Sequence, residues 1–378
     1  MAKNLSLSHE LHLVTIAEDK LDLTYKKELT PFFKSVQMIY LPKWKRVLNV
    51  LKSLFNAKPL QVNYFGSSDF SSLLNSMDLA EYDAIHVQHL RMSQFFDGNV
   101  PSHAILDLPD AFSLYWKRRK ERANNNLKKW FNGLEYKRLL KYEQKILPQF
   151  NLNLVCNEED KAYLQKTHNG GKTSARIELL SNGVDTHTFS PNHDNMIPLR
   201  VLFTGNMNYA PNVDGVEYFA NEIWPLVLKE VPKAKFIIAG QKPVPSVLAL
   251  SSDTIDVTGF IEDLAMEYTK AQVLVAPLRF GAGTQNKVLE AMSSAIPVVC
   301  TDIGFKGLNA KQGEGIWSFT EPKEFAAKVV DLLKDIEMAK SAGFKGESII
   351  QNHFSWKSIS KQLAVYFTDV HEYKGKNS

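Results

Sequence analysis

Runs of apolar and β-branched residues alternate with segments of helical periodicity along nearly the whole chain. These runs are continuous rather than alternately apolar and polar, which is typical of parallel strands that are covered on both faces. The predicted strands are 12–17, 36–41, 84–88, 104–108, 152–156, 177–181, 200–204, 235–239, 255–258, 272–276 and 297–301. Helical patterns lie between them, for example over 213–230 and 284–294. This repetition predicts an α/β fold with doubly wound parallel sheets.

A polar stretch over 183–199, rich in Asn, Asp, Pro and Gly, interrupts the pattern before a fresh strand begins at Arg200. Such a stretch indicates a domain boundary, and a chain of 378 residues suits two domains. We therefore expect one Rossmann-like domain over 1–190 and a second over 191–354. A last amphipathic helix is predicted over 355–367, and the segment 355–378 is expected to pack back on the first domain.

The first domain departs from the usual beginning of a doubly wound fold, which is a strand followed by a glycine-rich turn. Here the first strand-like run ends at Ala17 and no glycine follows it; the first glycine of the chain is Gly66. Either this domain has lost its phosphate-type loop, or the chain starts one strand late, in which case the opening strand and its loop are missing.

Composition narrows the class of protein. The chain is 44% hydrophobic and 23% charged, and no apolar run approaches the roughly 20 residues of a membrane-spanning helix. Integral membrane, disordered and fibrous proteins are therefore excluded. The first ten residues lack the apolar segment of a secretion signal. Cys156 and Cys300 lie in strand-like runs, where buried free thiols are expected. Together these features predict a cytoplasmic protein.

Positive charge gathers in the first half of the chain. Residues 1–185 hold 26 basic and 20 acidic residues, whereas the whole chain has a net charge of only +4. The segment 41–58 has five basic residues and no acidic one, and 113–131 repeats its mixture of basic and aromatic residues. Each segment is either a solvated face over a core or, because basic amphipathic helices bind membrane surfaces, a peripheral contact with the inner face of an anionic membrane. Nucleic acid is not expected as a partner, since no module that binds it is present.

The most specific chemistry lies in the second half. The predicted strand 272–276 is followed by Arg279, a loop with two glycines, and a helix that Thr284 is expected to cap. Amides at a helix N-terminus bind anions, and Arg279 adds a forked set of donors. Lys287 lies one turn into the helix, and Glu290 follows on the same face, where a carboxylate can accept from a ribose diol. The alternative is a set of surface ion pairs, which would contribute little.

Glu-Ala-Met, small residues and Pro-Val-Val after that glycine-rich loop resemble the donor site of GT-B glycosyltransferases, and more narrowly the retaining, glycosyltransferase-family-four type. The segments GNMNYAPNVDG and PLRFGAGTQNKVLEAM are similar to a bacterial subgroup linked to exopolysaccharide assembly. The resemblance covers most of the chain. It implies two Rossmann-like domains that face a cleft, with a nucleoside-diphosphate-sugar bound mainly to the second.

The resemblance also implies roles for individual residues. Glu290 would hold the ribose hydroxyls, and Gly205 and Asn206 would face the phosphates. The residues implied at the diphosphate are Arg279, Lys287 and the amides around Gly283, Thr284 and Gln285, with Asn286 as a further donor-binding residue; Gln241, Gly259 and Phe260 would line the base pocket. Neither a cofactor nor a metal ion is implied, because cationic side chains and the helix end would stabilise the departing nucleoside diphosphate. The sequence also shows no Asp-x-Asp at a strand end and no His, Cys and Asp cluster at ligand spacing.

The sequence departs from the family pattern in three places. Ala282 stands where a first glutamate commonly contacts the sugar, which leaves the donor sugar open. No Arg or Lys occurs over 206–209, where the family often has both. The first domain has no histidine after its middle strand. The catalytic candidates in that domain are Asp110, His89 and Asp107, with Arg91 beside His89.

These features predict a hexosyltransferase-type enzyme that transfers a sugar, with retention, from a nucleoside-diphosphate-sugar to a glycan or lipid-linked acceptor in cell-surface polysaccharide synthesis. Two alternatives stay open. A GT-B nucleotide-sugar epimerase would need further carboxylates and a histidine in the cleft. A degenerate GT-B binding subunit without transferase activity would fit Ala282 and the missing strand. An NAD oxidoreductase is disfavoured because no G-x-G-x-x-G follows a strand.

Overall fold

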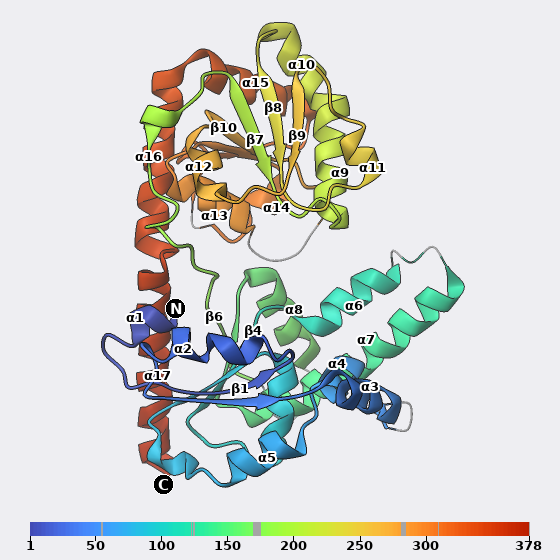
Figure 1. Ribbon diagram of the computed structural model, residues 1–378, viewed down its shortest axis with the longest axis vertical. Coiled ribbons are helices and arrows are strands. Elements are labelled where there is room, and N and C mark those ends of the chain that lie inside the picture. Colours follow the sequence, from blue (N-terminus) through green and yellow to red (C-terminus); the bar gives the residue numbers. More distant parts are fainter. Residues whose placement is uncertain are drawn as a thin grey trace. The chain divides into compact units, whose positions relative to one another are not determined.

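The computed structural model describes residues 1–53, 56–121, 123, 125–168, 175–280, 285–308 and 310–377. The chain forms two compact units, one of Met1–Ser181 with Ser360–Ser378 and one of Asn182–Ile359 (Figure 1). Helix α17, Trp356–Asn377, begins in the second unit and continues into the first. The named strands pair in parallel in both units. The predicted fold, an α/β protein with parallel sheets in two Rossmann-like domains, is confirmed.

The first unit holds two sets of parallel strands. β1 (His12–Ala17) pairs with β2 (Ser35–Tyr40). A second sheet has the strand order β3-β4-β5-β6. Its strands are β3 (Ile85–Gln88), β4 (Ala104–Leu108), β5 (Leu152–Val155) and β6 (Ile177–Leu179). Because β4 and β5 are parallel neighbours, Asp110 and Cys156, which follow them, come to the same edge of the sheet.

Helices cover this second sheet, and one apolar cluster joins β3–β6 to helices α4 to α8. The helices of the unit are α1 (Ala2–Leu5), α2 (Lys26–Leu29), α3 (Lys43–Lys52), α4 (Leu60–Tyr64), α5 (Ser68–Asn75), α6 (Phe112–Glu121), α7 (Asn126–Ile146) and α8 (Glu158–His168), with the 3₁₀ turns η1 (Asp22–Tyr25), η2 (Leu79–Glu81), η3 (Leu90–Phe95) and η4 (Leu147–Gln149). In α7 the spacing of Leu139, Tyr142 and Ile146 places all three on the buried face.

The second unit is built on a six-stranded parallel sheet in the order β12-β11-β10-β7-β8-β9. Its strands are β7 (Arg200–Thr204), β8 (Lys235–Ala239), β9 (Ile255–Gly259), β10 (Val273–Ala276), β11 (Val298–Cys300) and β12 (Ile316–Ser318). The chain builds outward from β7 to β9 and then crosses back to place β10 on the other side of β7. Ligands bind at the carboxyl ends of strands where the order reverses in this way, so the ends of β7 and β10 are the expected place for a site.

Helices cover both faces of this sheet, because successive side chains of a strand point to opposite sides. Phe203 and Phe236 pack with α9, α10 and α15, whereas Leu202 and Leu274 pack with α12, α13 and α16. The helices are α9 (Ala210–Tyr218), α10 (Trp224–Glu230), α11 (Pro245–Leu248), α12 (Leu264–Thr269), α13 (Asn286–Ser293), α14 (Asp302–Phe305), α15 (Pro322–Lys334) and α16 (Ile336–His353), with the 3₁₀ turn η5 (His193–Asn195).

The prediction of one continuous helix over 213–230 is wrong. The helix begins earlier, as α9, and a π-turn, η6 (Phe219–Ile223), separates α9 from α10. Pro225 lies at the start of α10 and lacks the N–H that a regular helix needs. The wider π-turn before it accommodates this loss.

The bounds of two helices and one additional strand also differ from the prediction. α13 begins at Asn286 and ends at Ser293. The last helix, expected over 355–367, continues to Asn377. β12 was not predicted, since three residues are too short to show a pattern, and it pairs with β11. Cys156 and Cys300 are both buried thiols that are not joined in a disulfide, as predicted. None of the helices in the described part of the chain is long and apolar enough to cross a membrane.

Candidate functional site

Close backbone packing marks the turns that follow β7 and β8. A Cβ atom added to Gly240 would lie 1.7 Å from the carbonyl oxygen of Gly205, and one added to Gly205 would lie 2.6 Å from Nδ2 of Asn212. Side chains do not fit at either glycine, so both turns depend on this residue. The result is a backbone that a ligand can approach closely, with the amide of Asn212 beside it.

Lys287 enters the same place from the first turn of α13. Its side chain is buried, its Nζ donates to Oδ1 of Asn212 at 2.7 Å, and Nζ lies 4.0 Å from the centroid of the Phe203 ring. Asn212 in turn donates to the carbonyl of Asn206, at 3.0 Å. Burial lowers the pKa of Lys287 to about 7, although the nearby Glu290 acts in the opposite direction. The buried Nζ of Lys287 is thus held between an amide oxygen and an aromatic ring.

Glu290 lies one turn further along α13, on the same face. Its Oε2 accepts from the hydroxyl of Tyr268 at 2.7 Å, and that hydroxyl is also 2.6 Å from Oγ1 of Thr204, the last residue of β7. Burial raises the pKa of Glu290, while the Tyr268 hydroxyl and Lys287 lower it. Tyr268 is fully buried on α12, so it holds the carboxylate in one orientation.

Lys287 and Glu290 therefore form a partly desolvated pair at the ends of β7 and β10. Among the described residues the Lys287 Nζ donates to one amide oxygen, so a second, anionic partner is favoured, and a phosphate is such a group. The Glu290 carboxylate can accept from hydroxyl groups but repels a phosphate. For these two residues the surface ion-pair interpretation is wrong, because Lys287 is only 8% exposed.

Arg279 has a different environment. Its Nε and Nη2 donate to the two carboxylate oxygens of Asp214 on α9, and its guanidinium lies 4.8 Å from the centroid of the Tyr218 ring. The Asp214 carboxylate raises the pKa of Arg279 above its usual value. The side chain is half exposed. Arg279 thus forms an ion pair in this structure, as the alternative interpretation of the sequence expected, and its partner Asp214 lies on the same helix as Asn212.

The residues assigned to the phosphates and the base lie at neighbouring strand ends. Asn206 follows Gly205 and accepts from the backbone N–H of Asn208. Gln241 follows Gly240, and its carbonyl accepts from the backbone N–H of Met207. Gly259 ends β9 with φ of 71°, a conformation that favours glycine, and Phe260 after it is 75% exposed.

Gln285 and Asn286 stand at the start of α13, Gln285 as its N-cap residue. Gly283 and Thr284, as well as Ala282, lie outside the described residues. The assignment of all these residues to a donor stays a prediction.

In the first unit, His89 follows β3 in a left-handed conformation with φ of 80°. Its ring lies 4.7 Å from the ring of Phe112, and its Nδ1 faces the backbone N–H of Arg91 at 3.4 Å. Burial, assisted by the positive charge of Arg91, lowers the pKa of His89 to about 3. His89 is therefore neutral at physiological pH, and it can exchange hydrogen bonds with a substrate but supplies no charge.

Asp107 lies within β4 and is already engaged. His86 on β3 donates from Nε2 to Oδ2 of Asp107 at 2.9 Å. The backbone carbonyl of Asp107 accepts from the N–H of His89 at 2.7 Å. These bonds tie the ends of β3 and β4 together. Asp107 thus has a positioning contact with the loop that carries His89.

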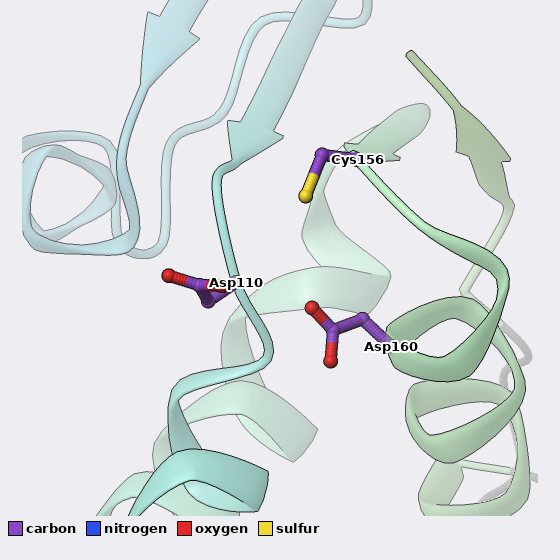
Figure 2. A group of neighbouring side chains, drawn as sticks. All are labelled: Asp110, Cys156 and Asp160. Atoms are coloured by element: carbon purple, nitrogen blue, oxygen red, sulfur yellow. The ribbon is translucent and has the colours of Figure 1, made fainter. Parts of the chain in front are cut away.

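Asp110 follows β4 and meets two side chains from the end of β5 and the start of α8. The ligand-type atoms of Asp110, Cys156 and Asp160 lie within 4.8 Å of one another (Figure 2). The Cys156 thiol donates to the carbonyl of Pro109, and Asn157 donates to Asp160 at 2.9 Å. Burial and the neighbouring Asp160 raise the pKa of Asp110 to about 6, and burial also raises the pKa of Asp160.

These three residues are the group in the described part of the chain whose side chains could hold a metal ion. They come from separate strand ends and a helix, so their spacing in the sequence gave no sign of the group. A carboxyl group with a pKa near 6 is also suited to proton exchange or to hydrogen bonding with hydroxyls near neutral pH.

Three contributors to the second unit's site were not predicted: Asn212, Tyr268 and Thr204. Asn212 lies within the segment GNMNYAPNVDG. Its position after a strand and a turn with proline could have marked it as a site residue. Tyr268 and Thr204 carry no such signal, since only the fold brings α12 and β7 to the Glu290 carboxylate.

Comparison with known proteins agrees with this geometry. Residues 198–335, which contain β7 to β11 and both Lys287 and Glu290, match the family model described as glycosyl transferases group 1. Over 371 residues the chain is 23% identical to an uncharacterized 44.6 kDa protein in the cps region of Klebsiella pneumoniae, covering 95% of this chain and 91% of that protein.

Two solved structures are similar along nearly the whole chain. One is sucrose-phosphate synthase from Thermosynechococcus elongatus, with 15% identity, a TM-score of 0.64, and coverage of 96% of this chain and all of that chain. The other is HepE from Anabaena in complex with UDP, with 12% identity, a TM-score of 0.62 and the same coverage. The fold is therefore GT-B, and residues 198–335, within the second unit, match the glycosyl transferases group 1 model. Together these findings support a GT-B glycosyltransferase.

Proposed function

We propose that this protein transfers a sugar, with retention of configuration, from a nucleoside-diphosphate-sugar to a glycan or lipid-linked acceptor. The observation that carries the proposal is the pair of the buried Lys287 and the half-buried Glu290 on α13, inside the segment that matches the glycosyltransferase family model. A diphosphate supplies further anionic oxygens for Lys287, and a ribose supplies hydroxyls from which Glu290 can accept.

The chemistry needs positive charge on the departing nucleoside diphosphate. Lys287 supplies it from a site of low polarity, where a charge interacts strongly. Arg279 adds a second cation once it exchanges Asp214 for a phosphate. We assign the reaction to these side chains and the α13 N-terminus, without a metal ion, as the family resemblance implied.

In the first unit, Asp110 and His89 are the residues assigned to the sugar and acceptor. Ionised Asp110 would accept from a sugar hydroxyl, and neutral His89 would exchange a hydrogen bond with another. The similarity to a protein of a cps region supports a role in cell-surface polysaccharide synthesis. The proposal includes a peripheral contact of the basic segments 41–58 and 113–131 with an anionic membrane.

Calorimetric titration with UDP and GDP, followed by donor turnover with a panel of UDP- and GDP-sugars, tests the proposal. Wild-type protein should bind one nucleotide and release it from the matching sugar donor, and proton NMR of the product should show a retained anomeric configuration. Glu290→Gln should lose most of the donor affinity. Glu324→Gln, an exposed glutamate of α15, is the matched control and should keep it.

Absence of binding to either nucleotide would overturn the proposal. Binding of a nucleotide without turnover of any donor or acceptor would instead favour the alternative of a GT-B binding subunit.

A further inference from the structure

Helix α3 is amphipathic, but it turns its polar face to the protein. Arg46 is buried, donates to Glu18, and reaches the Tyr64 hydroxyl at 2.8 Å. Asn49, three residues on, donates to the carbonyl of Gly66 at 2.7 Å. The inner face of α3 is thus held by hydrogen bonds rather than by an apolar core.

The apolar face of α3 points to solvent. Trp44, Val47, Leu48 and Leu51 occupy positions i, i+3, i+4 and i+7, and each is between 48% and 61% exposed. A surface helix of a globular protein normally buries such a stripe. The interpretation of this segment as a solvated face over a core is therefore wrong for α3, and its exposed stripe indicates a contact with something outside the unit.

A hollow of about 550 Å³ lies along this stripe. Its lining includes Lys45, Lys52 and Lys58, together with side chains from the start of α5 such as Ser67 and Ser68. Lys45 pairs with Asp69 at 3.2 Å. No acidic residue lines the hollow in the described part of the chain. The site has the volume of a small-molecule pocket and the donors that an anionic group needs.

A second exposed patch of the same chemistry lies at the start of α7. Figure 1 shows α7 beside α6 in this unit. Leu127 and Trp130 are 71% and 65% exposed, next to Lys128 and Lys129. α7 also contacts the segment after α3, since Glu135 accepts from the backbone N–H of Leu60 at 2.9 Å. Aromatic and aliphatic side chains among lysines suit the interface of a bilayer, where apolar groups insert and lysines reach the head groups.

A second copy of the chain fits this surface poorly. A two-fold contact would place the same patch against itself, and Lys52 and Lys58 line the hollow beside the stripe, where no acidic residue is found among the described ones. Basic patches would then repel each other. An anionic surface is complementary in both charge and apolarity.

From these observations we infer that the outward face of α3 inserts into an anionic phospholipid bilayer, and that the adjoining hollow receives the phosphate of a lipid head group. This deepens the membrane contact that is included in the proposed function. Trp44, Leu48 and Leu51 enter the interface, while Lys52 and Lys58 bind the head group. The site lies within the first unit and is separate from the donor residues of the second.

Sedimentation with phosphatidylcholine vesicles, with and without a rising fraction of phosphatidylglycerol, tests the inference. The wild type should bind anionic vesicles, and binding should weaken with salt. Leu48→Ser combined with Leu51→Ser should lower the partition coefficient roughly tenfold or more. Lys52→Gln and Lys58→Gln should each lower it about fivefold on anionic vesicles and hardly at all on neutral ones.

Matched controls lie on the second unit. Leu248→Ser replaces a leucine that is 50% exposed, as Leu51 is, and Lys323→Gln replaces an exposed lysine. Both should leave vesicle binding unchanged. The variants replace exposed side chains, and thermal unfolding checks that each is folded. Release of UDP from a sugar donor in detergent-free buffer reports the proposed function separately, and the α3 variants should retain it.

Equal binding to neutral and anionic vesicles, or unchanged binding by the α3 variants, would overturn the inference. Absence of vesicle binding together with self-association that Leu48→Ser and Leu51→Ser abolish would also overturn it, in favour of a contact between copies. Loss of donor turnover with vesicle binding intact would count only against the proposed function.

Discussion

Nucleotide-sugar binding should take up a proton, and Lys287 is the reason. In the free protein its buried Nζ donates to the amide oxygen of Asn212, and burial lowers its pKa to about 7. A bound diphosphate adds negative charge next to it, which favours the charged form and returns the pKa to the usual range near 10.4 or above. The lysine is then largely neutral before binding and charged afterwards wherever the pH lies between these values.

The size of the effect follows from the lowered pKa. At pH 8 a group with a pKa of about 7 is roughly 10% protonated, so binding should take up about 0.9 proton; at pH 6 it should take up only about 0.1. Because protons are linked to binding, the dissociation constant should rise about ninefold between pH 8 and pH 9. The sign is fixed: affinity falls as the pH rises, since the proton becomes harder to obtain.

Calorimetry in buffers of different ionisation enthalpy measures this uptake directly. A nucleotide-sugar is the suitable ligand, since its diphosphate carries no group that titrates near neutral pH. Lys287→Met should abolish both the uptake and the pH dependence, and should weaken binding at pH 6 more than at pH 9. Lys323→Gln, at an exposed position of the same unit, is the control. Uptake near zero at pH 8, or uptake that persists in Lys287→Met, would refute the reasoning.

Other substitutions test the remaining contacts. Tyr268→Phe removes the hydroxyl that donates to Glu290, so donor affinity should fall about tenfold. Because that hydroxyl lowers the pKa of Glu290, the pH below which binding is lost should also move to a higher value. Binding titrations at acidic pH check this, and an unchanged pH for the loss of binding would count against it. Asp110→Asn should lower kcat by about two orders of magnitude and remove a rise in activity through pH 6, with nucleotide affinity unchanged, as kinetics across pH would show. Gly240→Ala should destabilise the protein by several kcal/mol, about 3 or more, because the new Cβ would lie 1.7 Å from the carbonyl oxygen of Gly205; a chemical denaturation midpoint equal to the wild type's would contradict the close approach.

Much of the framework could be predicted because local patterns decide it. Continuous apolar runs at strand positions require cover on both faces, and the two apolar layers on the sheet of the second unit supply that cover. The segment with Lys287 and Glu290 could be singled out because a strand, a glycine-rich loop and a helix start follow one another in the sequence. The π-turn before Pro225 and the three-residue β12 escaped prediction, because both depend on packing rather than on periodicity.

By itself the sequence determined the succession of strands and helices, the parallel fold, and the helix that carries Lys287 and Glu290. Only the tertiary structure decided which groups surround them: Asn212 on the lysine, Tyr268 on the glutamate, and Asp214 on Arg279. It likewise decided that α3 buries Arg46 and exposes its leucines, an orientation that periodicity cannot reveal, since an apolar stripe looks the same whether it faces a core or solvent. Periodicity is a local property of the chain, whereas burial and partners depend on residues that are distant in sequence, and those contacts set the charge state and the reach of each functional side chain.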